Sequence, residues 1–140
     1  MTPHQLKANQ LIQHFGQTIN ASLSLKDGVC ALFDTNHQET AIVEVPDFSD
    51  NIIFHCSLLK LPPEVTPQAM RKMLLLNFEI SAMQGCWLAI DENDQLCLCH
   101  VLPLDKTNEQ HFTDTLVGFI EQVKDVRAFT TDLLRETVQH

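Results

Sequence analysis

The stretch that decides the fold is Met70–Leu104, MRKMLLLNFEISAMQGCWLAIDENDQLCLCHVLPL. Its first part belongs to a helix that we predict from Thr66 to about Met83. Thr66 can cap this helix, and Pro67 takes the first helical position, where its missing N–H group is no loss. Gly85 follows as a typical helix terminator. The chain therefore leaves a helix and passes directly into two short apolar runs.

These apolar runs flank an acidic turn and predict a β-hairpin. Cys86–Ile90 is the first strand, Asp91–Asp94 is the turn, and residues 95–102 form the return strand, which Pro103 closes. An antiparallel hairpin normally keeps one face in water, but nearly every side chain in both runs is apolar or cysteine. We therefore expect both faces of the hairpin to be covered.

The rest of the chain predicts an α+β domain. An amphipathic helix is expected over Pro3–Ser22, and a long helix from Thr107 to about Thr137, with Thr107 and Gln110 as a capping box. Three further strands lie between polar turns and prolines, at Gly28–Phe33, Thr40–Val45 and Asn51–Leu59. The predicted order is α-β-β-β-α-β-β-α, an antiparallel sheet with helices packed against it. A chain of 140 residues with this order leaves no room for a second core, so we expect a single domain over residues 1–140.

Charge and composition exclude several classes of protein. The chain has 18 Asp+Glu against 9 Lys+Arg, a formal charge of −9, which does not suit a nucleic-acid binder. The acidity favours solubility, or else a basic or apolar partner. No segment is apolar for long enough to insert into a membrane, and the N-terminal residues lack the pattern of a secretory signal. The 5 cysteines lie in apolar contexts, which predicts reduced thiols in the cytoplasm rather than disulfides.

Three patterns resemble reactive or metal-binding sites, and each fails because side chains face opposite ways or because required residues are missing. Cys97-Leu98-Cys99-His100 offers zinc ligands, but on a strand the two cysteines share one face and the histidine points to the other. His55 and Cys56 are adjacent on a strand and cannot pair as base and nucleophile. Asp91–Asp94 lacks the glycine and the distant glutamate of a calcium loop. We therefore predict no catalytic residue, no metal ligand and no cofactor.

Several segments combine into a pattern that extends over essentially the whole chain. They are Leu74–Phe78, Gly85–Asp91, Leu96–Leu98, Leu102–Leu104 and a last helix with Phe112, Leu116 and Phe119. A leucine-rich helix ending in Asn precedes a Gly and an apolar strand ending in Asp, and a Leu-Pro pair leads into the last helix. This pattern resembles the class I type III secretion chaperones, the Tir chaperone family.

The resemblance implies a cytoplasmic bacterial homodimer without enzymatic activity, a virulence-associated protein of protein transport. It would bind the N-terminal segment of a secreted effector in extended form and deliver it to the export apparatus, with the export ATPase as a further possible partner. In that family the second helix and the neighbouring strand build the dimer interface, which places Met70, Met73, Leu74, Phe78, Trp87 and Leu88 there. We expect the effector to contact the first helix and the first two strands at Leu11, Phe15, Leu32, Phe33 and Ile42.

Two rival functions stay open at this point. One is an adaptor that binds a folded component of a secretion apparatus rather than an unfolded effector. The other is a small thiol enzyme that uses Cys56 or Cys86. A partner that contributes an extended segment would favour the chaperone, whereas an activity that is lost on alkylation of a single cysteine would favour the enzyme.

Overall fold

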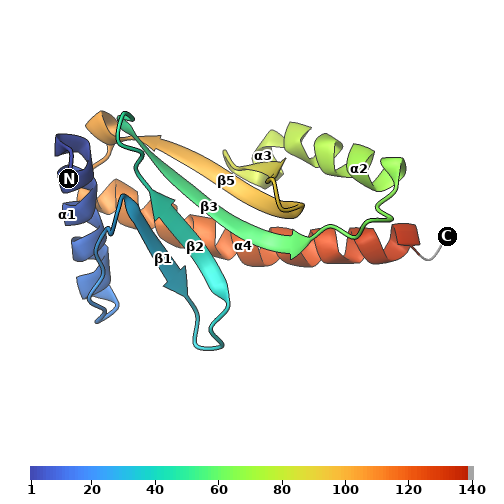
Figure 1. Ribbon diagram of the computed structural model, residues 1–140, viewed down its shortest axis with the longest axis horizontal. Coiled ribbons are helices and arrows are strands. Elements are labelled where there is room, and N and C mark those ends of the chain that lie inside the picture. The colour runs from blue at the N-terminus through green and yellow to red at the C-terminus, as the bar shows by residue number, and fades with distance from the viewer. Residues whose placement is uncertain (139–140) are drawn as a thin grey trace.

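The structure is a computed structural model that describes residues 1–138. The predicted domain of residues 1–140 includes Gln139 and His140, which lie outside the described residues. The elements in chain order are α1 (Pro3–Thr18), β1 (Val29–Phe33), β2 (Glu39–Glu44), β3 (Asn51–Lys60), α2 (Pro67–Phe78), α3 (Ile80–Met83), β4 (Trp87–Ile90), β5 (Gln95–Pro103), the 3-10 helix η1 (Leu104–Lys106) and α4 (Glu109–Val138). Apart from the short α3 and η1, this is the predicted order, which is confirmed (Figure 1). None of the helices in residues 1–138 is both long and apolar enough to cross a membrane.

The strands of the described residues form one antiparallel sheet in the order β1-β2-β3-β5-β4. Successive side chains of β3 alternate between burial and partial exposure, as Phe54 and His55 do. The sheet therefore has an inner face toward the helices and an outer face. The register of the strands places these side chains on the outer face: Ala31, Ile42, Ile53, His55, Cys97, Cys99, Val101, Trp87 and Ala89.

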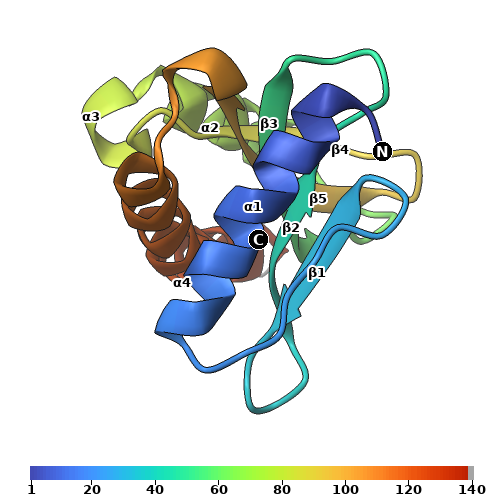
Figure 2. The same cartoon turned by 90° about the vertical axis from the view of Figure 1, so that its left-hand side faces the viewer.

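Helices α1 and α4 pack on the inner face, as Figures 1 and 2 show. The long α4 extends behind the sheet, and α1 lies beside it near β1 and β2. At the centre of the core, the Phe54 ring lies 5.7 Å from the rings of both Phe112 and Phe119. The apolar residues noted on the last helix, Phe112, Leu116 and Phe119, are buried, and the buried stripe continues along α4 with Val123, Val126 and Leu133.

Arg127 fastens α4 to the sheet at an irregular point of β3. The register of β3 against β5 shifts between Ser57 and Leu59. There the Arg127 Nε donates to the Leu58 carbonyl at 3.0 Å, and its Nη2 donates to the Ser57 carbonyl at 2.8 Å and to the Glu39 carbonyl at 3.4 Å. One side chain of α4 thus satisfies main-chain carbonyls of both β3 and β2.

The helix predicted from Thr66 to Met83 is wrong beyond Phe78. α2 ends at Phe78, Glu79 leaves the helical region with φ −81° and ψ 74°, and α3 is a separate turn. The Asn77 side chain holds the end of α2 against Leu88 of β4, while the chain turns so that Met83 becomes buried. The apolar pattern of the sequence does not show this break, because the break depends on contacts with the sheet.

The first helix is shorter than predicted, since α1 ends at Thr18 and not at Ser22. The Ala21 N–H donates to the Gly16 carbonyl at 2.8 Å and folds the chain back on itself. A Cβ at Gly16 would lie 2.6 Å from the Ala21 oxygen, so a glycine is required for this close return.

The cap predicted for the last helix is also displaced by one residue. The side chain of Asn108 accepts from the His111 N–H at 2.8 Å, and α4 begins at Glu109. The Thr107 hydroxyl instead donates to the Pro103 carbonyl at 2.7 Å and is buried in the preceding turn. Both residues are good caps, and the η1 turn decides between them.

Candidate partner-binding surfaces

The first candidate surface is a groove between α1, β1 and α4, which we call the α1–β1 groove. It has a volume of about 630 Å³ and is mostly apolar. Its lining includes Phe15, Ile19, Leu23, Ala31, Leu32, Phe33, Val117 and Ile120. Three of the residues predicted to contact a partner, Phe15, Leu32 and Phe33, therefore meet in one groove, although they come from two distant segments.

These three residues differ in how much surface they offer. Phe15 is 4% exposed and Leu32 is 8% exposed, so both form the floor of the groove. Phe33 is 60% exposed and can bury a large area on binding. Ile19 and Val117, which sequence reasoning missed, are 52% and 48% exposed on the groove walls. Val117 lies outside the buried stripe of its helix, which is the signal that could have indicated it.

The other two predicted contact residues lie elsewhere. Leu11 is buried in the core beneath α1. Ile42 lies half-buried on the outer face of the sheet, opposite His55 of β3 and Ala31 of β1. The predicted partner contacts at Leu11 and Ile42 stay predictions.

The edge strand β1 borders the groove with free main-chain groups. Val29 is already engaged, since its N–H and carbonyl both bond to Lys26, at 3.1 and 2.8 Å. Main-chain groups alternate between the two sides of a strand, so Ala31 and Phe33 also face away from β2. No other main-chain segment within residues 1–138 bonds to these outward groups. The edge is therefore open over Ala31–Phe33.

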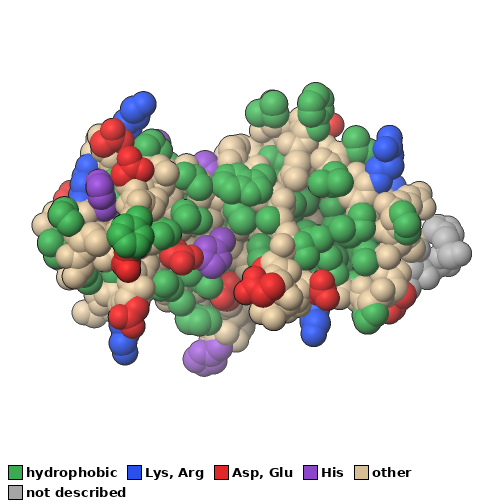
Figure 3. All heavy atoms as spheres, turned by 45° about the horizontal axis from the view of Figure 1, so that its top comes forward, with side chains coloured by type: hydrophobic (Ala, Val, Ile, Leu, Met, Phe, Trp, Pro, Cys, Tyr) green, Lys and Arg blue, Asp and Glu red, His purple; other side chains and the backbone are tan. Residues whose placement is uncertain are grey.

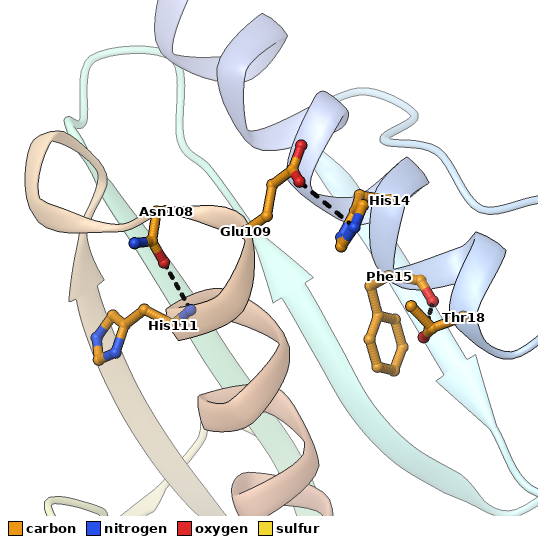
Figure 4. Close-up of polar contacts among 6 residues, drawn as sticks. All are labelled: His14, Phe15, Thr18, Asn108, Glu109 and His111. Atoms are coloured by element: carbon orange, nitrogen blue, oxygen red, sulfur yellow. Dashed lines mark hydrogen bonds and ion pairs between the residues drawn. The ribbon is translucent and has the colours of Figure 1, made fainter.

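Figure 4 shows polar contacts of α1 beside the groove, one of them with the start of α4. The His14 Nε2 lies 3.4 Å from a carboxylate oxygen of Glu109, in the first turn of α4. The Thr18 hydroxyl donates to the Phe15 carbonyl at 2.6 Å within the last turn of α1. Phe15 itself is buried in the core cluster, which fixes its place in the groove floor.

The second candidate surface, the α2–β4 surface, joins the outer side of α2 to the hairpin. Its large exposed side chains are Leu74, Leu75, Phe78, Ile80, Trp87 and Ile90. Phe78 is 81% exposed. Figure 3 shows hydrophobic side chains over the side of the molecule that carries α2. An exposed apolar area of this kind usually marks an interaction site.

The α2–β4 surface contains some of the predicted dimer-interface residues but not all. Leu74, Phe78 and Trp87 are exposed there, and Met70 is half-buried at its base. Met73 and Leu88 are buried within the chain, at 3% and 7% exposure. Their predicted roles in dimerisation stay predictions. Sequence reasoning missed Leu75, Ile80 and Ile90, of which Ile90 stands at the end of the predicted apolar strand.

Comparison with known proteins assigns the chain to a family. The family model of the Tir chaperone protein (CesT) family matches residues 10–127. The chain belongs to the Tir chaperone family. No curated protein sequence matches it.

Solved structures share the fold of this Tir chaperone family member. The ExsC–ExsE complex matches with a TM-score of 0.72 and 17% identity, over 93% of this chain and 95% of that chain. The HopA1–SchA chaperone–effector complex matches with a TM-score of 0.72 and 16% identity, over 91% of this chain and 98% of that chain. The ExoU–SpcU complex of the Pseudomonas aeruginosa type III secretion system matches with a TM-score of 0.65 and 17% identity, over 90% of this chain and 96% of that chain. At these identities the likeness shows the fold, which agrees with the predicted α+β class.

The thiols of the described chain are poor nucleophiles. Burial, followed by the charge of Glu39, raises the pKa of Cys56 to about 12. Burial is also the main cause that raises the pKa of Cys86 and of Cys97 to about 11. The thiolate is the reactive form, so these groups stay protonated near neutral pH. Within residues 1–138, no group of three or more His, Cys, Asp or Glu side chains is arranged to hold a metal ion.

Proposed function

We propose that this Tir chaperone family member binds an effector of a type III secretion system and delivers it to the export apparatus. The proposed ligand is the N-terminal segment of the effector in extended form. Family membership supports a chaperone role, and solved relatives of the same fold include a complex described as chaperone and effector. The proposed place of action is the bacterial cytoplasm, with the export ATPase as a further partner and the whole chain acting as one domain.

The observation that carries the proposal is the open β1 edge beside the α1–β1 groove. An extended segment can pair with the outward main-chain groups of Ala31 and Phe33 and add a strand to the sheet. Its apolar side chains can then bury the exposed Phe33 and Ile19 in the groove. A disordered segment loses conformational entropy on binding, so an extended contact over strand and groove suits it better than one deep pocket.

Homodimerisation through the α2–β4 surface is the second part of the proposal. The exposed Leu74, Phe78 and Trp87 would be covered by the same residues of a second copy, as in a two-fold symmetric interface. Light scattering should give about twice the 15.9 kDa mass of one chain. Phe78→Asp should lower this mass to that of the monomer, whereas Leu6→Asp, at an exposed site on α1, should not. A monomeric wild-type protein at micromolar concentration would contradict the proposed dimer.

Copurification identifies the partner. We would copurify it with the chain from a native bacterial lysate, identify it and trim it to the shortest segment that binds. Chaperone function requires that this segment bind without being folded. A partner that binds only when folded would instead support the adaptor function. We further propose that the protein is not an enzyme, and the raised pKa of each thiol argues against the thiol-enzyme alternative.

The groove is tested with the trimmed segment and two matched variants. Phe33→Asp should weaken binding by about tenfold or more, because burial of a phenylalanine contributes about 1.5–3 kcal/mol. Phe48→Asp is the control, since Phe48 is fully exposed in the loop between β2 and β3 and is no part of the groove. Ile42→Asp tests the outer face of the sheet in the same way. Normal binding by a folded Phe33→Asp variant would show that the groove is not the site.

A further inference from the structure

The sheet of the described residues has two edge strands, β1 and β4. The two differ in how their outward main-chain groups are satisfied, and the proposed function makes no use of this difference. At β4, a side chain replaces a neighbouring strand. The Leu88 N–H donates to the Asn77 Oδ1 at 2.7 Å, and the Asn77 Nδ2 donates to the Leu88 carbonyl at 3.3 Å. One amide group thus satisfies both main-chain groups of one residue, as a paired strand would do.

The position of Leu88 within β4 makes this pairing decisive. The main-chain N–H and C=O groups of Trp87 and Ala89 point toward β5, so those of Leu88 and Ile90 point away from the sheet. On the N-terminal side, the Cys86 N–H already donates to the Met83 carbonyl at 2.9 Å. Within the described chain, Ile90 is the outward residue of β4 that has no such contact, and one residue is too few for a strand to pair along.

Helix α2 supplies the support that keeps the amide in place. Asn77 is in the last turn of α2, which packs beside β4. Met73, one turn earlier, is buried, and it lines a small groove of about 160 Å³ between the helix and the strand with Asn77, Leu88 and Ile90. The amide is therefore held at the strand by the packing of its own helix.

We infer that the Asn77 amide closes the β4 edge to strand addition. An extended peptide that pairs with this sheet is then directed to Ala31 and Phe33 of β1. A second copy on the α2–β4 surface is directed to contact through side chains and not through paired strands. The consequences for the effector and for the dimer rest on the proposed function, whereas closure of the edge does not.

Closure matters because the surroundings of β4 favour pairing. An exposed edge flanked by apolar side chains is a template for association, and proteins commonly block such edges. Trp87 and Ile90 are 40% and 42% exposed beside Leu88. Without the amide, the Leu88 main-chain groups would be available next to this apolar surface.

The first test measures amide hydrogen exchange in the wild type and in Asn77→Ala. The protection of the Leu88 amide should fall roughly tenfold, the effect of losing one hydrogen bond. The amides of Trp87 and Ala89 should keep their protection, because they face β5. Unchanged Leu88 protection, or an equal loss along all of β4, would overturn the inference, since an equal loss would mean that Asn77 acts through general stability.

Asn9→Ala is the matched control. The Asn9 Oδ1 accepts from the Leu25 N–H at 2.7 Å, so this variant removes a similar bond far from β4. It should release the Leu25 amide and leave Leu88 protected. Asn77→Asp keeps an acceptor for the Leu88 N–H but loses the donor to its carbonyl, and it should retain part of the protection. Loss of Leu88 protection in Asn9→Ala would overturn the inference.

The second test uses a synthetic peptide that copies residues 38–45, which contain β2 and are therefore able to pair as a strand. Both proteins in this test also carry Phe78→Asp, so that a second copy does not cover β4. With Asn77 present, NMR shifts on peptide addition should be confined to β1, whereas Asn77→Ala should add shifts at Leu88 and Ile90. A peptide with methylated main-chain nitrogens should cause neither. Shifts at β4 with Asn77 present, or none at β4 with Asn77→Ala, would overturn the inference. Neither test needs the natural partner, so both can be interpreted even if the proposed function fails.

Discussion

Replacing Arg127 by methionine should destabilise the fold more than the same substitution at any other charged residue on α4. Methionine keeps most of the aliphatic stem but removes the three donations to the carbonyls of Ser57, Leu58 and Glu39. Two of these bonds, at 2.8 and 3.0 Å, have ordinary hydrogen-bond lengths, and bonds from a charged donor contribute about 1.5–3 kcal/mol each. The half-buried guanidinium also loses solvation on folding, which offsets part of this gain. The expected loss of unfolding free energy is about 2–4 kcal/mol.

Urea denaturation followed by circular dichroism measures this loss. With an m-value of about 2 kcal/mol/M, the midpoint should fall by about 1–2 M. Wild type and variant must be compared at equal protein concentration, because the proposed homodimer would gain stability by mass action. The urea midpoint of Arg127→Lys should lie between those of the wild type and Arg127→Met, since an ammonium group cannot reach several carbonyls with the geometry of a guanidinium.

Arg135 provides the control on the same helix. The Arg135 side chain is 73% exposed and lies 3.8 Å from Asp132. Arg135→Met should therefore change the stability by less than about 0.5 kcal/mol. If Arg127→Met were as stable as Arg135→Met, the reasoning that Arg127 fastens α4 to the sheet would be refuted.

Three further predictions concern stability. The Cys56 thiol ionises near pH 9.0 in the unfolded chain and near pH 12 in the folded one. Its contribution to stability should therefore be fully present below pH 9.0 and decrease by about 1.4 kcal/mol per pH unit from there to pH 12, in addition to the contributions of the other thiols whose pKa is raised. Cys56→Ala should reduce the slope in pH-dependent urea melts. Phe54→Ala should cost about 3–5 kcal/mol, because the ring is fully buried against Phe112; a loss below about 1 kcal/mol would contradict this packing. Gly28→Ala should lower the melting temperature, since Gly28 has φ +78° and its Cβ would lie 2.8 Å from the Val45 oxygen, and an unchanged melting temperature would contradict that geometry.

Local signals in the chain were enough to predict the elements and part of the candidate site. The hairpin around Asp91–Asp94 follows from turn chemistry and from the change to apolar runs, and neither depends on distant residues. The same holds for the buried stripe of α4. Helix ends were less predictable, because the end of α2 depends on a bond between Asn77 and Leu88, which is 11 residues away in the sequence.

Which apolar residues remain at the surface was decided by tertiary structure. Leu32 and Phe33 are neighbours in one strand, and alternation predicts that they differ, but only the packing of α1 and α4 determines that Leu32 is buried and Phe33 is exposed. Met73 and Leu74 differ in the same way on α2. The sequence thus determined the elements, their order and their apolar faces, because these depend on short-range geometry. The structure decided which face meets the core and which sheet edge stays open, because these depend on contacts between distant segments.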